Sequence, residues 1–181
     1  MRLRLFDPGT DFETIRGWIA GERAHALWCA NRFRYPLDQE DFTGVLAGTA
    51  HGAGNTPFVA VGGDGAAVGF FCYSLDKASK EGKLKFIVVA PECRGRRIAA
   101  EMLRLAADYA FGETGAESIS LSVFPVNARA KRCYEKAGFA ERSTVDRAFG
   151  FGDESWGRCD MVLRKGSGRP VRENGAGGGP R

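Results

Sequence analysis

A strand, a basic turn and a helix follow one another in the middle of the chain, and this succession constrains the fold more than any other feature. The strand covers residues 84–89, and Pro91 prevents its continuation. A helix is predicted to begin near Arg97, because apolar residues then recur at helical spacing: Ile98, Met102, Leu105, Ala106 and Tyr109. The first turn of such a helix presents free N–H groups and the positive end of its dipole, which favours a bound pyrophosphate.

Two common phosphate-binding motifs are absent from the sequence. It contains neither Gly-x-x-x-x-Gly-Lys-Ser/Thr nor Gly-x-Gly-x-x-Gly with an acidic residue about twenty positions later. Nucleoside triphosphates and dinucleotides are therefore not the expected ligands. Arg94, Arg96 and Arg97 are predicted to attract the phosphates, although an ordinary basic helix start would have the same composition.

A second segment, residues 121–139, has the pattern of a strand followed by a short helix. Asn127 is a favourable N-cap, and Gly138 a favourable left-handed terminator. Tyr134 follows Asn127 by seven residues, which places both on nearly the same helix face about 10 Å apart. One extended ligand could contact both residues. The alternative is that Tyr134 only packs the helix on a sheet and Asn127 only caps it.

Both segments resemble motifs of the GNAT superfamily of N-acyltransferases. The first resembles its acyl-CoA-binding loop, Arg/Gln-x-x-Gly-x-Gly/Ala after a strand ending in Val-x-Pro, and here reads Arg94-Gly95-Arg96-Arg97-Ile98-Ala99. The second resembles the later strand, Asn, Tyr and Gly-Phe motif of the same superfamily. Arg97 stands where the family usually has Gly, and we expect a helical backbone there that accommodates a side chain.

The resemblance implies an acetyl-CoA-dependent N-acetyltransferase in which a primary amine of a small molecule or a peptide N-terminus attacks the thioester directly. It implies that Tyr134 is the general acid that protonates the leaving CoA thiolate, and that the N–H of Val89 polarises the thioester carbonyl. No metal is expected. The residues expected to bind the cofactor are Ile87, Val88, Val89, Arg94, Gly95, Arg96, Arg97, Ile98, Ala99, Ala100 and Asn127.

The sequence does not identify the residue that acts as the general base. Family members that acetylate protein N-termini often carry Glu where this chain has Ser122, and the outward positions of the first strand hold Lys83 and Lys85. Candidates for the base are Glu22, His25, His51, Asp76, Asp153 and Glu154, and candidates for an aromatic acceptor pocket are Trp28, Phe33, Tyr35, Phe149 and Trp156. Because Ser122 stands in place of that Glu and Arg97 in place of the motif glycine, a non-catalytic acyl-CoA-binding regulatory module of the same fold remains the alternative.

The resemblance also implies the fold: an α/β (α+β) GNAT domain over residues 1–165, with a mixed, mostly antiparallel sheet of six to seven strands. The sheet is expected to splay at the acyl-CoA cleft, between four to five flanking helices. The closest group is expected to be the small bacterial enzymes related to ribosomal-protein N-terminal acetyltransferases.

Residues 166–181 contain six glycines in sixteen residues and are predicted to be a disordered tail. Strands are predicted over residues 2–6, 58–61, 68–75, 84–89, 118–124, 139–145 and 157–164, and helices over 11–19, 22–30, 38–46, from 97 onward and from 127 to 137.

Composition restricts the remaining possibilities. The net charge of +4 is carried entirely by the residues after Leu163, so the body is formally neutral and no nucleic-acid partner is expected. The five cysteines are scattered without a Cys-x-x-Cys pair, which argues against a disulfide framework or a zinc site. No signal-peptide pattern or membrane-length apolar run is present, so we expect a cytoplasmic monomer or homodimer with no membrane partner.

Overall fold

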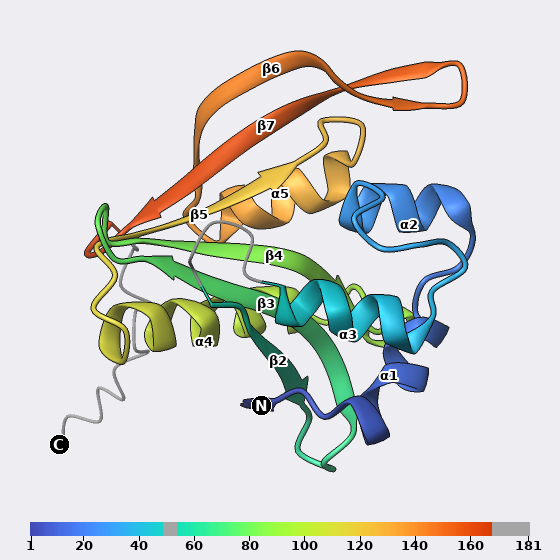
Figure 1. Ribbon diagram of the computed structural model, residues 1–181. Coiled ribbons are helices and arrows are strands. Elements are labelled where there is room, and N and C mark those ends of the chain that lie inside the picture. The colour runs from blue at the N-terminus through green and yellow to red at the C-terminus, as the bar shows by residue number, and fades with distance from the viewer. Residues whose placement is uncertain (49–53, 168–181) are drawn as a thin grey trace, which may run out of the picture.

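Seven strands form one sheet in the order β1-β2-β3-β4-β5-β7-β6 in the computed structural model, which describes residues 1–48 and 54–167 (Figure 1). Only the β4–β5 pair is parallel. The predicted mixed, mostly antiparallel GNAT-type sheet is confirmed. The strands are β1 (Arg2–Leu5), β2 (Thr56–Val61), β3 (Ala67–Asp76), β4 (Glu81–Val89), β5 (Ser118–Val123), β6 (Ala140–Phe151) and β7 (Glu154–Arg164).

Five α-helices are described: α1 (Pro8–Gly17), α2 (Glu22–Cys29), α3 (Gln39–Ala47), α4 (Ile98–Gly112) and α5 (Ala128–Lys136). A short 3-10 helix, η1 (Pro91–Cys93), joins β4 to the basic loop. Within the described residues no helix is long and apolar enough to cross a membrane. Of the predicted disordered tail, residues 166–181, all but the first two lie outside the described residues, as does the candidate base His51.

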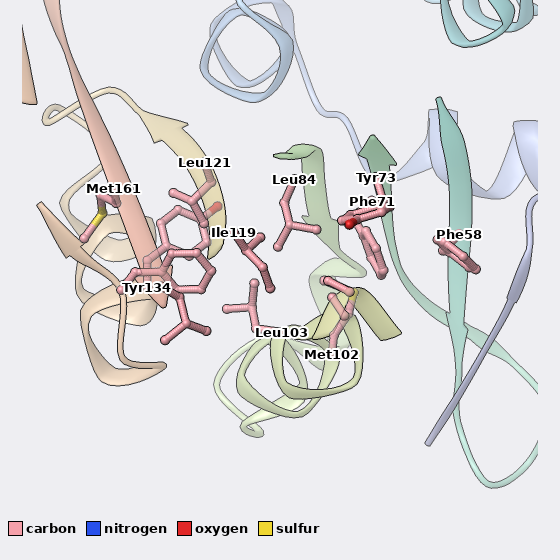
Figure 2. Packing of buried hydrophobic residues seen from close by; sticks show 14 of the residues in the cluster. Phe58, Phe71, Tyr73, Leu84, Met102, Leu103, Ile119, Leu121, Tyr134 and Met161 are labelled. Atoms are coloured by element: carbon pink, nitrogen blue, oxygen red, sulfur yellow. The ribbon is translucent and has the colours of Figure 1, made fainter. Parts of the chain in front are cut away.

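Alternating side chains of the central strands supply a separate core on each face of the sheet. In β2, Phe58 and Ala60 pack with α4 and α5, whereas Val59 and Val61 pack with α1, α2 and α3. Figure 2 shows the first of these cores. Met102 and Leu103 of α4 pack against residues of the strands, and Tyr134 of α5 lies near Ile119. The period-two pattern of each strand therefore fixes which helices cover which face.

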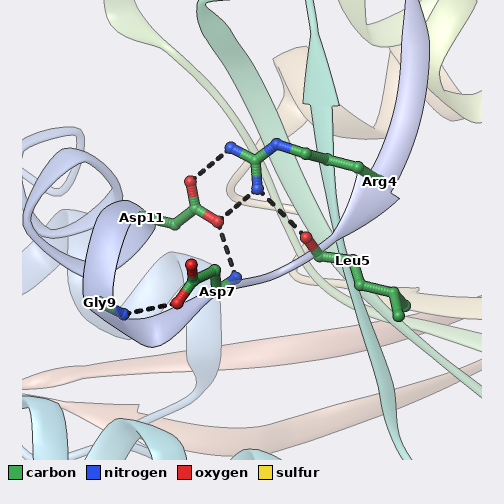
Figure 3. A network of polar contacts seen from close by, with 5 residues as sticks. All are labelled: Arg4, Leu5, Asp7, Gly9 and Asp11. Carbon is green, nitrogen blue, oxygen red and sulfur yellow. Dashed lines mark hydrogen bonds and ion pairs between the residues drawn. The ribbon is translucent and has the colours of Figure 1, made fainter.

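The connection between β1 and α1 is held by a network of polar contacts (Figure 3). The Arg4 guanidinium donates to both carboxylate oxygens of Asp11, at 2.6 Å each, and the Asp7 N–H donates to Asp11 at 2.8 Å. Asp7 is the N-cap of α1 and accepts from the Gly9 N–H at 2.9 Å. A buried carboxylate thus has all its partners supplied by its own local segment.

The final hairpin is longer than the sequence predicts. We expected a strand ending at Val145, but β6 continues to Phe151 and pairs with β7 as far as Glu154. Its ladder is irregular between Val145 and Phe149, and Arg147 there has a φ of 50°. Nearly all of β6 is exposed, so its side chains carry no alternation of polarity that could reveal the extension.

Candidate active site

A cleft of about 1900 Å³ runs between β4 and β5 and is lined by both sequence motifs. The two strands pair only over three residues, from Glu81↔Ser118 to Lys83↔Ser120. Beyond these pairs the edges of the two strands separate, as the predicted splay requires. Backbone groups on the parted edges are available to a ligand that pairs like an added strand.

A β-bulge in β4 lies where the strands part. Cys72 of β3 pairs with Lys85, yet Phe70 pairs with Val88, so one intervening residue of β3 faces two of β4. Phe86, one of these two, has a φ of 53°. Bulges bend a strand and redirect its groups, often beside active sites. The sequence analysis missed this feature, since a phenylalanine gives no signal for a left-handed backbone.

The basic loop after β4 carries two left-handed residues, Gly95 with a φ of 83° and Arg97 with a φ of 64°. Our expectation of a helical backbone at Arg97 is therefore wrong: α4 begins one residue later, and Arg97 is its N-cap residue. No side chain caps α4, so its first N–H groups have no such partner in the described structure. The Arg94 Nε donates to the carbonyl of Val89 at 3.1 Å, which ties the loop to the strand end.

The short helix α5 is bounded as the sequence predicts. The Asn127 side chain accepts from the Ala130 N–H at 3.2 Å, which confirms the N-cap. Gly138 has a φ of 94°, and the N–H of Phe139 donates to the Tyr134 carbonyl at 3.0 Å, which is the 6→1 bond of a Schellman motif. Asn127 therefore caps the helix and also lines the cleft.

Tyr134 lies on the cleft wall with its ring largely inside the protein. It is 9% exposed and its ring centre is 6.3 Å from that of Phe139. Burial raises the pKa of its phenol, with a further contribution from Cys133. The phenol is therefore fully protonated at neutral pH, as a proton donor must be.

The cleft brings together nearly all the residues predicted to bind the cofactor. Of these predicted residues, all of which are described, Arg96 alone does not line the cleft. The residues that do are Ile87, Val88, Val89, Arg94, Gly95, Arg97, Ile98, Ala99, Ala100 and Asn127. Basic side chains, free helix N–H groups and a free strand edge together suit the diphosphate and amides of acyl-CoA.

The candidate bases are mostly engaged elsewhere. Asp76 lines the cleft, with its carboxylate accepting from the N–H groups of Ala78 and Ser79 at 2.9 and 3.4 Å. Glu154 pairs with Arg23 and accepts from the Trp156 indole N–H at 2.9 Å. The remaining described candidates, Glu22, His25 and Asp153, do not line the cleft.

His25 is fully buried, and burial lowers its pKa, although its contacts with neighbouring polar groups oppose the shift. Trp28 and Phe149 line the cleft, whereas Phe33, Tyr35 and Trp156 do not. Trp28 stacks on Phe33, and its buried Nε1 has no hydrogen-bond partner among the described residues.

One polar pair at the cleft was missed by the sequence analysis. The Ser122 hydroxyl donates to the Asp160 carboxylate at 2.6 Å across the β5–β7 ladder. Burial alone would raise the pKa of Asp160, but the hydrogen bond from Ser122 and the charge of Arg158 outweigh it, so the net shift is downward. The only sequence signal was the position of Asp160 in the last strand, which does not reveal its partner.

Residues 21–139 match the acetyltransferase (GNAT) family, and the chain belongs to this family. Over 88 residues it is 41% identical to the streptothricin acetyltransferase of Streptomyces lavendulae, covering 49% of this chain and 46% of that one. An uncharacterised N-acetyltransferase of Methanocaldococcus jannaschii is 28% identical over 92 residues, covering 51% and 58% of the two chains. These matches thus span about half the length of the curated relatives.

Solved structures share the fold. The spermidine N-acetyltransferase of Vibrio cholerae in complex with CoA and spermine superimposes with a TM-score of 0.76 at 20% identity, over 91% of this chain and 95% of that one. A putative phosphinothricin N-acetyltransferase gives 0.72 at 20% identity, over 90% and 96%. None of the relatives named here is a ribosomal-protein acetyltransferase, so that subgroup stays a prediction.

Proposed function

We propose that the protein is an acetyl-CoA-dependent N-acetyltransferase that acts on a primary amine of a small molecule. The observation that carries the proposal is the buried, protonated phenol of Tyr134 on the wall of the cleft that begins at the acyl-CoA loop. A module that only binds acyl-CoA has no use for a proton donor at this position. The streptothricin and spermidine acetyltransferases among the relatives support a small-molecule acceptor. We also propose that residues 1–165 form the whole domain.

In the proposed reaction the neutral amine attacks the thioester carbonyl, and a C–N bond forms as the carbonyl becomes a tetrahedral oxyanion. The Val89 N–H, on the parted edge of β4, is proposed to donate to that oxygen. The C–S bond then breaks, and the phenol of Tyr134 gives its proton to the departing thiolate. The proton lost by the amine passes to solvent or to Asp76, which is the candidate base among the described residues that line the cleft, and solvent returns a proton to the Tyr134 phenolate.

Tyr134→Phe tests this function. It should lower kcat by about 10² to 10⁴, the usual effect of removing a general acid, and leave the affinity for CoA unchanged. Tyr109→Phe is the matched control, because Tyr109 packs against Phe58 and Tyr73 under the sheet and does not line the cleft. Equal turnover of wild type and Tyr134→Phe would exclude Tyr134 from the mechanism.

The assay should measure the acetylated amine by mass spectrometry as well as the released thiol. Cys93 and Cys133 line the cleft as free thiols and could react with a thiol reagent. A panel of amines with no acetylated product, despite saturable CoA binding, would instead support the non-catalytic module.

A further inference from the structure

The part of the cleft on the α2 side is lined by positive charge. Leu84 packs into the core with α4, so its neighbours Lys83 and Lys85 project from the opposite face of β4. Both lysines line the cleft, as does Arg32, which follows α2. This region is distinct from the basic loop, which lies beyond the other end of β4. The cleft therefore has a second cationic region, on the side away from α4.

These three cations have no direct salt-bridge partner among the described residues, although the charge of Lys83 contributes to lowering the pKa of both Glu81 and Asp160. The Lys85 ammonium donates to the neutral Asn55 amide oxygen at 2.9 Å. Burial lowers the pKa of Lys85, and the nearby charges of Lys83 and Arg32 lower it further. An ammonium with three donors and one partner retains donors for a ligand.

The acidic residues that line the described cleft do not offset this charge. Asp76 and Glu81 are the two carboxylates of the described lining. Asp160 lies beside it, where it accepts a hydrogen bond from the lining residue Ser122 and pairs with Arg158 at 3.2 Å. Glu81 accepts two hydrogen bonds from Arg142, at 2.6 and 3.2 Å, and Asp76 is held by the turn that follows it. The part of the cleft beside Lys83, Lys85 and Arg32 therefore keeps a positive charge.

We propose that the acceptor is a small amine that also carries an anionic group, a carboxylate or a phosphate, which Lys83, Lys85 and Arg32 bind. This inference rests on the proposed function and narrows it. The positive charge of this partly buried site attracts an amine that also carries an anionic group. A polyamine would instead place like charges together there.

The test uses pairs of amines in which only one member carries an anionic group. Each α-amino acid is paired with the amine left after removal of its carboxylate. 4-Aminobutanoate is paired with butylamine, and 3-aminopropyl phosphate with propylamine. Spermidine is the polycationic member. We expect kcat/KM to be at least about tenfold higher for the anionic member of a pair, equivalent to about 1.4 kcal/mol. The carboxylate and phosphate arms show which anionic group is preferred.

Lys83→Gln with Lys85→Gln should remove this preference. The double variant is expected to raise KM for the amines that carry an anionic group about tenfold or more, and to leave KM unchanged for their partners that lack this group. Lys80→Gln removes one positive charge outside the cleft, where Lys80 pairs with Glu117 at 2.6 Å, and should retain the preference; it is the matched control for Lys83→Gln alone. If the double variant does not fold, the exposed Lys83→Gln alone carries the test.

Three outcomes would overturn the inference. The first is equal or better turnover of spermidine and of the amines that lack an anionic group. The second is an equal loss for both members of each pair in the double variant, and the third is retention of the full preference in that variant. If no amine of either charge is acetylated, the proposed function fails separately. Calorimetric titration of the CoA-saturated protein with the same pairs then decides: preferential binding of the anionic members supports the inference, and equal or no binding contradicts it.

Discussion

Arg97 departs from a family motif in residue type, yet its backbone has the conformation that favours the glycine of the motif. Its φ of 64° places it in the left-handed region, where glycine is favoured and another residue costs about 1 to 3 kcal/mol. The structure retains this conformation, and α4 then begins with its N–H groups uncapped beside the cleft. The arginine is therefore accommodated by backbone strain rather than by a change of loop.

Alanine and glycine at position 97 distinguish this geometry from a helical one. Arg97→Gly should be more stable than Arg97→Ala by about 1 kcal/mol, because only glycine adopts a positive φ without cost. The same pair at Arg104, in the exposed interior of α4, should show the reverse order by about 1 kcal/mol. Denaturant unfolding measures both differences. A more stable Ala variant at both positions would indicate that residue 97 is helical after all.

Residues whose role is local were predictable from the sequence. Asn127 and Gly138 act within one helix, and their side-chain chemistry alone indicates a cap and a terminator. The hydrogen bond between Ser122 and Asp160 depends on strand register across positions 38 residues apart. No spacing in the sequence specifies such a register, so this polar pair required the structure.

At the scale of an element, α1 is attached to β1 by a carboxylate whose ionisation affects stability. Burial by itself raises the pKa of Asp11, but the hydrogen bonds from Arg4 and from the Asp7 N–H outweigh burial and lower it overall. A lowered pKa in the folded state means that this carboxylate stabilises the fold above its unfolded pKa of about 3.9. That contribution is lost as the pH falls toward the folded value.

Asp11→Asn should lower the free energy of unfolding by about 1 to 3 kcal/mol at pH 7, the usual contribution of hydrogen bonds to a charged group. The difference from wild type should shrink as the pH falls below about 4, where wild type also loses the charge. Unfolding in urea at several pH values measures it. Glu13→Gln on the exposed face of α1 is the control and should have little effect at any pH. A difference that does not depend on pH would contradict the assigned role of the charge.

Elements were predicted best where at least one face is buried. The strands β2, β3 and β7 alternate or run apolar, and their boundaries agree with the sequence prediction within a few residues. The β6 extension, the bulge at Phe86 and the cleft volume all depend on how strands meet, which periodicity does not encode. The sequence therefore predicted the two motifs and their helices, while the shape of the acceptor side came from tertiary structure.

For the whole molecule, the two parts of the central sheet meet at the three β4–β5 pairs, and the core that includes α4 and α5 connects them on one face. A CoA molecule in the cleft would contact residues of both β4 and α5 and link the two parts. At a hundredfold excess over Kd, CoA should stabilise the fold by about 2.7 kcal/mol, or roughly 5 to 11 °C in Tm for a chain of this size. Differential scanning fluorimetry measures the shift. No shift at saturating CoA would contradict the assignment of the cleft.

The parted edges of β4 and β5 also affect how the protein can be handled. An unpaired strand edge is a template for association with another chain, which most sheets avoid by covering or charging it. Here the apolar segment Ile87–Val89 lies on such an edge within the cleft. The backbone groups proposed to pair with pantetheine can pair equally with an extended strand from a neighbouring molecule. Purification and storage with CoA should therefore suppress precipitation, because the ligand and the aggregate compete for one edge.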